Sequence, residues 1–139
     1  MEPDKVAKTM EDKKPKKRIL FVEDDDGLAS VYQMRLQAEG FEVQRVANGE
    51  EALAAALKFK PELILLDVML PKVSGFDVLD ILRNTPETAN IKVVMLTALS
   101  QDNDKQRAKD LGVDDYLVKS QVVMSDVIDK LKSHLGMQQ

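Results

Sequence analysis

Short apolar segments alternate five times with segments of helical length, and this alternation limits the folds open to the chain. The apolar segments, rich in strand-forming residues, occupy residues 18–22, 42–46, 62–66, 91–96 and 115–118. The helix-length segments occupy residues 27–39, 49–59, 75–84, 103–111 and 122–135. Strand–helix alternation with short connections predicts an α/β fold, a five-stranded parallel sheet covered by helices on both faces. Because crossovers between parallel strands are right-handed, an open, doubly wound sheet is favoured.

Individual segments also predict their own places in this fold. Residues 62–66 and 91–96 are nearly continuous apolar runs, which is typical of central strands covered on both faces. Residues 42–46 alternate apolar and polar side chains, which indicates an edge strand. Residues 103–111 contain only Ala108 and Leu111 as apolar side chains, so this helix should pack shallowly.

The composition excludes several classes of protein. Cysteine is absent, which rules out disulfides, thiolate metal sites and cysteine nucleophiles and suits a reducing cytoplasm. A net charge of −4 does not suit a surface built to bind nucleic acid. No long apolar stretch or signal peptide is present, so we expect neither a membrane span nor secretion. The charged residues 1–16 should form a flexible leader before one domain at residues 17–139.

Polar and charged residues follow four of the predicted strands at the point where each strand ends. They are Glu23, Asp24, Asp67, Thr97 and Lys119. In doubly wound sheets the carboxyl ends of the strands meet at one edge, where ligands bind, so these side chains should converge there. Two carboxylates about 4 Å apart repel by roughly 4 kcal/mol at an effective dielectric near 20. Three of them therefore indicate a bound hard divalent cation, Mg²⁺ or alternatively Mn²⁺, which prefer oxygen ligands.

Acids, a divalent cation, a hydroxyl and a lysine together can hold a phosphoryl group. A carboxylate can act as the nucleophile and form an aspartyl-phosphate. Asp67 is the best candidate because it ends a central apolar strand. Glu23, Asp24 and the backbone carbonyl of Met69 would hold the cation. Thr97 and Lys119 would contact the phosphoryl oxygens.

Four stretches of the sequence resemble the receiver domain of bacterial two-component response regulators. They read ILFVEDD, LILLDVMLPKVSGFDVL, VVMLTA and GVDDYLVK, and the resemblance runs from about residue 18 to residue 135. It implies the flavodoxin-like (βα)5 fold with strand order 2-1-3-4-5. It also implies a role for each matching residue: Asp67 as phospho-acceptor, Glu23 and Asp24 as the acidic metal pair, Met69 as main-chain ligand, Thr97 and Tyr116 as switch residues, and Lys119 as the phosphate-pairing lysine.

The resemblance implies partners as well. A histidine kinase or phosphotransfer protein would donate the phosphoryl group, and a downstream effector protein would read a surface formed by the fourth helix, fifth strand and fifth helix. Binding of nucleic acid or membrane is not expected, and the chain would be a monomer or a phosphorylation-dependent dimer in the cytoplasm. The chain is expected to be a stand-alone regulator, unless an output domain has been removed from it.

Ser120 departs from the family, which usually has a proline after the lysine, commonly with a cis bond. A cis bond before a non-proline residue costs roughly 2.5–4 kcal/mol, so a trans bond is favoured here. Ser120 or Ser125 could then cap the final helix, and Asp26 is the expected N-cap of the first.

Other interpretations remain open for these residues. Thr97 could be an ordinary loop hydroxyl, and Tyr116 a half-buried strand aromatic. The chain could be a receiver-like module that binds partners without being phosphorylated. A haloacid-dehalogenase-type phosphatase would need a second Asp two residues after the nucleophile, where Met69 stands, so no enzyme activity is expected beyond the chain's own phosphorylation and dephosphorylation.

Overall fold

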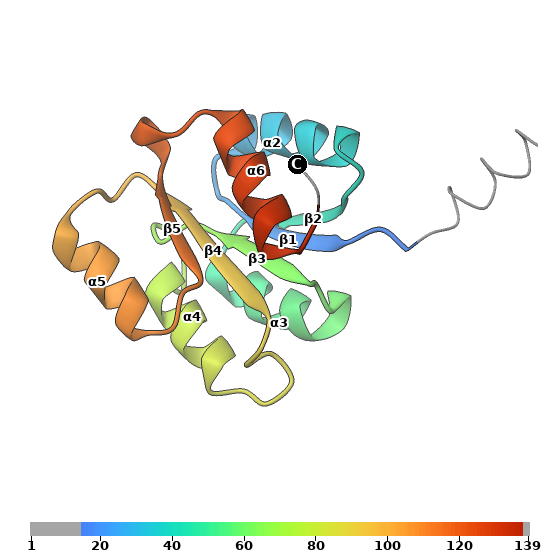
Figure 1. Ribbon diagram of the computed structural model, residues 1–139. Helices are drawn as coiled ribbons and strands as arrows, with labels where there is room; N and C mark the ends of the chain where they lie inside the picture. Colours follow the sequence, from blue (N-terminus) through green and yellow to red (C-terminus); the bar gives the residue numbers. More distant parts are fainter. Residues whose placement is uncertain (1–14, 138–139) are drawn as a thin grey trace, which may run out of the picture.

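The five strands form one parallel sheet in the order β2-β1-β3-β4-β5 (Figure 1). The structure, a computed structural model, describes residues 15–137 of the 139. The strands are β1 (Arg18–Val22), β2 (Glu42–Val46), β3 (Leu63–Leu66), β4 (Lys92–Thr97) and β5 (Asp115–Val118). The predicted strand order is confirmed, and β2 lies at an edge as its alternating side chains predict. All of the predicted leader except its last two residues lies outside the described residues.

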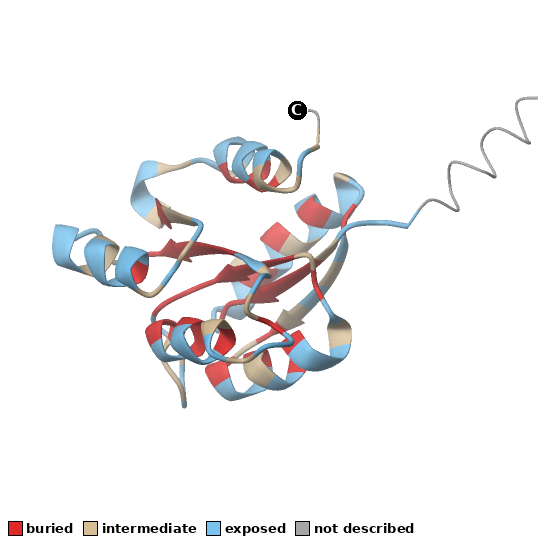
Figure 2. Ribbon diagram, turned by 60° about the horizontal axis from the view of Figure 1, so that its bottom comes forward, coloured by how far each residue is buried: buried red, intermediate tan, exposed pale blue. Residues whose placement is uncertain are grey.

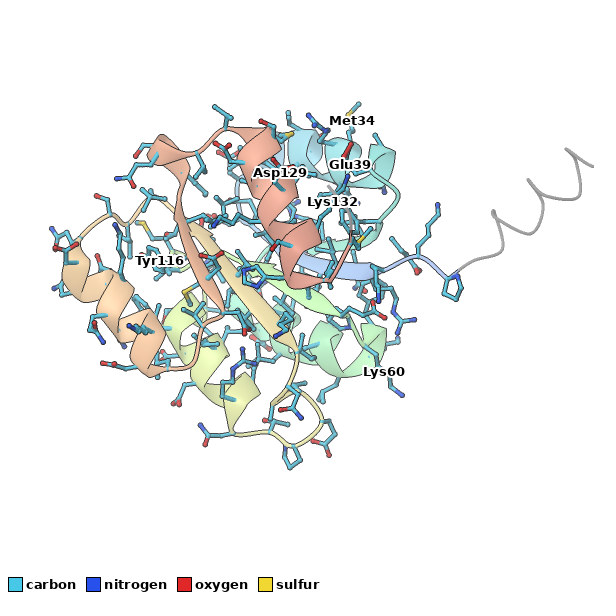
Figure 3. The ribbon with its side chains drawn as sticks, in the orientation of Figure 1. Met34, Glu39, Lys60, Tyr116, Asp129 and Lys132 are labelled. Atoms are coloured by element: carbon cyan, nitrogen blue, oxygen red, sulfur yellow. The ribbon has the colours of Figure 1, made fainter. Side chains whose placement is uncertain are left out.

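Helices cover both faces of the sheet, as predicted. Among the described residues they are α2 (Asp26–Ala38), α3 (Gly49–Phe59), α4 (Gly75–Arg83), α5 (Asp102–Asp110) and α6 (Met124–His134). Helices α2 and α6 lie on one face, and α3, α4 and α5 lie on the other (Figure 1). Lys132 on α6 reaches Glu39 at the end of α2 at 2.9 Å, which ties the first pair together (Figure 3). No helix within residues 15–137 combines the length and the apolar character needed to cross a membrane.

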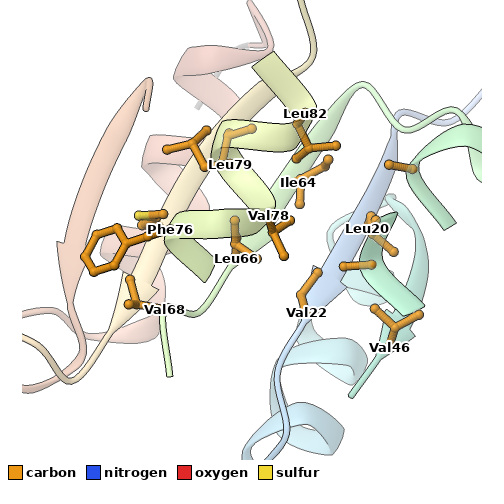
Figure 4. Packing of buried hydrophobic residues seen from close by; sticks show 14 of the residues in the cluster. Leu20, Val22, Val46, Ile64, Leu66, Val68, Phe76, Val78, Leu79 and Leu82 are labelled. Atoms are coloured by element: carbon orange, nitrogen blue, oxygen red, sulfur yellow. The ribbon is translucent and has the colours of Figure 1, made fainter. Parts of the chain in front are cut away.

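Two apolar cores result from the alternation of side chains along the strands. Leu20 and Val22 of β1 face α3 and α4, as Figure 4 shows, while Ile19 and Phe21 face α2 and α6. The central strands β1, β3 and β4 are almost completely buried, whereas the outward faces of the helices are exposed (Figure 2). The sheet is therefore a rigid platform whose carboxyl end presents the polar residues.

Helix α5 is the most weakly packed of these helices, which confirms the prediction made from its composition. Ala108 is its one buried residue. Arg107 adds a contact, since its guanidinium lies 4.3 Å from the centre of the Phe76 ring on α4. A helix held by so few buried groups can shift at low cost in free energy.

The helix caps differ from the predicted ones. Asp25, not Asp26, caps α2, and its carboxylate accepts a hydrogen bond from the Leu28 N–H at 3.0 Å. A short 3₁₀ turn, η1 (Lys119–Gln121), precedes α6, and neither serine caps that helix. The Asp126 carboxylate instead accepts from the N–H of Val123 at 3.0 Å. No described peptide bond is cis, so the bond before Ser120 is trans as favoured.

Candidate functional site

The carboxyl ends of four strands bring the candidate residues to one edge of the sheet. Glu23 and Asp24 directly follow β1, Asp67 follows β3, Thr97 is the last residue of β4 and Lys119 follows β5. Strands β1, β3, β4 and β5 are consecutive neighbours in the sheet. The parallel arrangement therefore gathers residues that lie far apart in the sequence.

Three carboxylates form the centre of this site. Glu23, Asp24 and Asp67 each offer a carboxylate oxygen, and these oxygens lie within 4.8 Å of one another. Glu23 is 1% exposed and Asp67 4% exposed, whereas Asp24 is exposed. Carboxylate oxygens are the ligands that a hard divalent cation prefers, and here two come from buried acids and one from an exposed acid. These residues fit such an ion.

Lys119 lies between the two buried acids. Its ammonium donates to Glu23 Oε1 at 2.6 Å and to Asp67 Oδ2 at 2.9 Å. Burial alone would lower the pKa of Lys119, but the hydrogen bonds to Glu23 and Asp67 outweigh it, so the pKa lies above its usual value. Burial raises the pKa of Glu23, and the hydrogen bond from Lys119 offsets part of that rise. One ammonium thus faces three carboxylates, which leaves the site negative.

The hydroxyl groups of Thr97 and Tyr116 meet the same stretch of backbone. Thr97 is completely buried, and its Oγ1 accepts from the Leu99 N–H at 3.4 Å. The Tyr116 hydroxyl donates to the Leu99 carbonyl at 2.9 Å. Burial, followed by the charges of Asp104 and Asp67, raises the pKa of Tyr116 to about 12. Both hydroxyls therefore link the site to the segment that leads into α5.

The segment after Asp67 is held by backbone contacts. The N–H of Met69 donates to Asp67 Oδ1 at 3.1 Å, so the Met69 backbone lies beside Asp67. A Cβ at Gly75 would come within 2.2 Å of the Asp67 carbonyl oxygen, and a Cβ at Gly49 within 2.1 Å of the Val73 carbonyl oxygen. Only glycine permits the starts of α3 and α4 to approach this segment so closely.

Arg45 on β2 belongs to the surroundings of the site, although the sequence analysis gave it no role. Its Nε donates to the backbone carbonyl of Glu23 at 2.9 Å, and its Nη1 pairs with Asp26 Oδ1 at 2.9 Å. The sequence offers one signal, because Arg45 is a charged residue near the end of a predicted strand. The structure adds that Arg45 lies opposite Phe21 in the sheet, two residues before Glu23.

Comparison with known proteins gives the same family from sequence and from structure. Residues 19–132 match the family model of the response regulator receiver domain. The chain is 45% identical over 102 residues to the DNA-binding dual master transcriptional regulator RpaA of Synechocystis, which covers 73% of this chain and 42% of RpaA. It is 34% identical over 120 residues to the polar-differentiation response regulator DivK of Brucella anthropi, which covers 86% of this chain and 97% of DivK. The chain thus spans less than half of RpaA and nearly all of DivK.

Solved structures agree. A response regulator from Chloroflexus aurantiacus superposes with a TM-score of 0.82 at 32% identity, over 88% of this chain and 99% of that one. The receiver domain of the sensor histidine kinase PA1611 from Pseudomonas aeruginosa superposes with a TM-score of 0.80 at 26% identity, over 88% of this chain and 99% of that one. It was crystallised with a magnesium ion coordinated in its active-site cleft. The family model covers most of this chain, and the fold agrees with it, so the chain belongs to the response regulator receiver domain family.

Proposed function

We propose that this receiver takes a phosphoryl group onto Asp67 in a Mg²⁺-dependent reaction and thereby switches a surface that binds a partner. The observation that carries this proposal is the convergence of Lys119 and the carboxylates of Glu23 and Asp24 around Asp67. A buried carboxylate that faces an ammonium and a cation-binding cluster has the surroundings that phosphoryl transfer requires.

Oxygen ligands for the cation are available from residues that precede Asp67 in the sequence and from one that follows it. Glu23, Asp24 and Asp67 would supply carboxylates and Met69 its backbone carbonyl, with Mn²⁺ as an alternative to Mg²⁺. The magnesium ion in the cleft of the PA1611 receiver supports this assignment. When bound, the cation neutralises charge on the phosphoryl oxygens.

Asp67 acts as the nucleophile. One of its carboxylate oxygens forms a bond to phosphorus while the bond from phosphorus to the donor's leaving group breaks, and the leaving group keeps the electron pair. Lys119, already bonded to Asp67, pairs with a phosphoryl oxygen. The buried Thr97 hydroxyl accepts from the Leu99 N–H, so its own proton can be donated to another phosphoryl oxygen.

The switch follows from the charge that Asp67 gains, roughly −1.5 to −2. Thr97 and Tyr116 both hydrogen-bond to Leu99, so movement of Thr97 toward the phosphoryl group pulls on the segment before α5. The weakly packed α5 moves with it, and the surface formed by α5, β5 and α6 changes. A coupling of about 1–3 kcal/mol is enough for such a switch.

The partners follow from the same proposal. A histidine kinase or phosphotransfer protein donates the phosphoryl group, and a downstream effector protein reads the α5–β5–α6 surface. The described domain has no direct role with nucleic acid, acts in the cytoplasm as a monomer or phosphorylation-dependent dimer, and catalyses only its own phosphorylation and dephosphorylation. The DNA-binding activity in the name of RpaA belongs to that longer protein and is not assigned to this chain.

The experiment is incubation with Mg²⁺ and a small acyl phosphate, followed by measurement of the intact mass. Wild type should gain one phosphoryl group, and Asp67→Asn should gain none. Asp102→Asn is the matched control, because Asp102 is an exposed acid on α5, and it should behave as wild type. If wild type gains no mass with this donor or with a histidine kinase, the chain is instead a receiver that binds partners without phosphorylation.

A further inference from the structure

We propose that Arg45 is a positioning residue for the cation site, which holds the connection between β1 and α2 so that Glu23 and Asp24 face Asp67. This inference rests on the proposed binding of a divalent cation. Arg45 itself touches neither the cation nor the phosphoryl group in this role. It acts through the two residues on either side of the Asp24–Asp25 pair.

The guanidinium of Arg45 reaches both ends of that connection. Nε donates to the carbonyl of Glu23 and Nη1 pairs with the carboxylate of Asp26, each at 2.9 Å. Asp24 lies between these two fixed points. The connection has internal support as well, because the Asp25 N–H donates to Glu23 Oε2 at 3.1 Å. Arg45 is therefore the bridge from the neighbouring strand β2 that fixes where the acids stand.

Stability alone gives a poor account of an arginine at this place. The Asp26 side chain is 90% exposed, so its ion pair with Arg45 contributes little. The Nη2 of Arg45 is buried and has no hydrogen-bond partner among the described residues, which costs free energy. An apolar side chain could fill the same space without that cost. What arginine alone provides is a planar group that binds two separate oxygens at once.

The positioning role and the bare charge of Arg45 have opposite effects on cation binding. A positive charge close to the site repels a cation, so removal of the charge by itself would tighten binding. Loss of the bridge lets Glu23 and Asp24 leave their places, which weakens binding. The direction of the change in Kd therefore separates the two.

The test is a titration of the full chain with Mg²⁺, monitored by NMR. The Kd is measured from the shifts of the amide signals of Asp24 and Met69. Arg45→Met should raise the Kd by about tenfold, the lower end of what loss of an outer-shell partner of a metal ligand costs. Arg45→Lys keeps the charge, but its single ammonium cannot replace both bonds, so its Kd should also rise. Arg35→Met is the control, since Arg35 is an exposed arginine of α2 paired with Glu39, and its Kd should equal that of wild type.

A Kd equal to or below that of wild type in either Arg45 variant overturns the proposal. So does an equal rise in Arg35→Met, which would show that the weaker binding is not specific to loss of the Arg45 bridge. If Arg45→Met does not fold, as judged by its NMR spectrum, Arg45→Lys alone decides. Failure of wild type itself to bind Mg²⁺ would instead refute the proposed function, so the two failures are distinct.

Discussion

Replacement of Asp24 by asparagine should stabilise the cation-free protein, even though Asp24 is a proposed cation ligand. Asp24, Glu23 and Asp67 have carboxylate oxygens within 4.8 Å of one another. At that distance two like charges repel by about 0.9 kcal/mol in bulk water and about 3.5 kcal/mol at an effective dielectric of 20. Asp24 meets two such charges, and attraction to Lys119 offsets about one of them. Loss of its charge should therefore raise the free energy of unfolding by about 1–3 kcal/mol.

The assay is urea unfolding at pH 7, first with EDTA and then with Mg²⁺. Glu42→Gln is the matched control, because it removes one negative charge from an exposed residue at the opposite end of β2. With Mg²⁺ at 100 times its Kd, wild type should gain about 2.7 kcal/mol. Asp24→Asn should gain less, because it has lost a ligand. Its stability relative to wild type should thus fall when Mg²⁺ replaces EDTA.

Two results would refute this reasoning. If Asp24→Asn were no more stable than Glu42→Gln in EDTA, the three carboxylates would not repel one another as their distances require. If Mg²⁺ stabilised Asp24→Asn as much as wild type, Asp24 would not be a ligand of the cation.

Three further predictions concern neighbouring features. Burial raises the pKa of Glu23 above 4.5, so wild type loses stability as the pH rises from 4.5 through the raised pKa. The free energy of unfolding of Glu23→Gln, which does not titrate, should therefore rise relative to that of wild type between pH 4.5 and pH 7 in EDTA. A difference in unfolding free energy that stays constant over this range would contradict this. Gly75→Ala places a Cβ 2.2 Å from the carbonyl oxygen of Asp67 and should destabilise by about 1–3 kcal/mol in urea unfolding. Gly27→Ala, whose nearest contact is 3.4 Å, should not destabilise. Arg83 donates to three backbone carbonyls and one carboxylate, so Arg83→Met should lower the unfolding temperature by an amount that corresponds to about 3 kcal/mol, and an unchanged melting temperature would contradict its bridging role.

The sequence predicts most of the fold because its periodicities are strong. Continuous apolar runs identify the central strands, and the alternation at residues 42–46 identifies an edge. The order of all five strands came from the family resemblance, since alternation alone leaves several right-handed arrangements possible. The cap of α2 was predicted one residue late because Asp25 and Asp26 are equally suitable caps, and only the backbone path decides between them.

The sequence also predicts which residues gather at the site, because the end of each strand fixes them. It does not predict what a long side chain reaches. Lys119 was expected at this edge of the sheet, but only the structure shows that its ammonium lies between Glu23 and Asp67. Arg45 was missed for the same reason. Its contact with the Glu23 carbonyl depends on the register of β2 beside β1 and on the side-chain conformation.

The glycine contacts at the starts of α3 and α4 make these two helices harder to displace than α5. At Gly49 and Gly75 the backbone of each helix lies so close to neighbouring backbone that no Cβ fits between them. Beside β5, by contrast, α5 is held by one buried residue, Ala108, and by the contact of Arg107 with the Phe76 ring. A structural change caused by added charge at Asp67 should therefore displace α5 more readily than α3 or α4. If Asp67 is phosphorylated as proposed, we expect substitutions that pack α5 more tightly to weaken the change at the partner-binding surface without changing phosphorylation of Asp67.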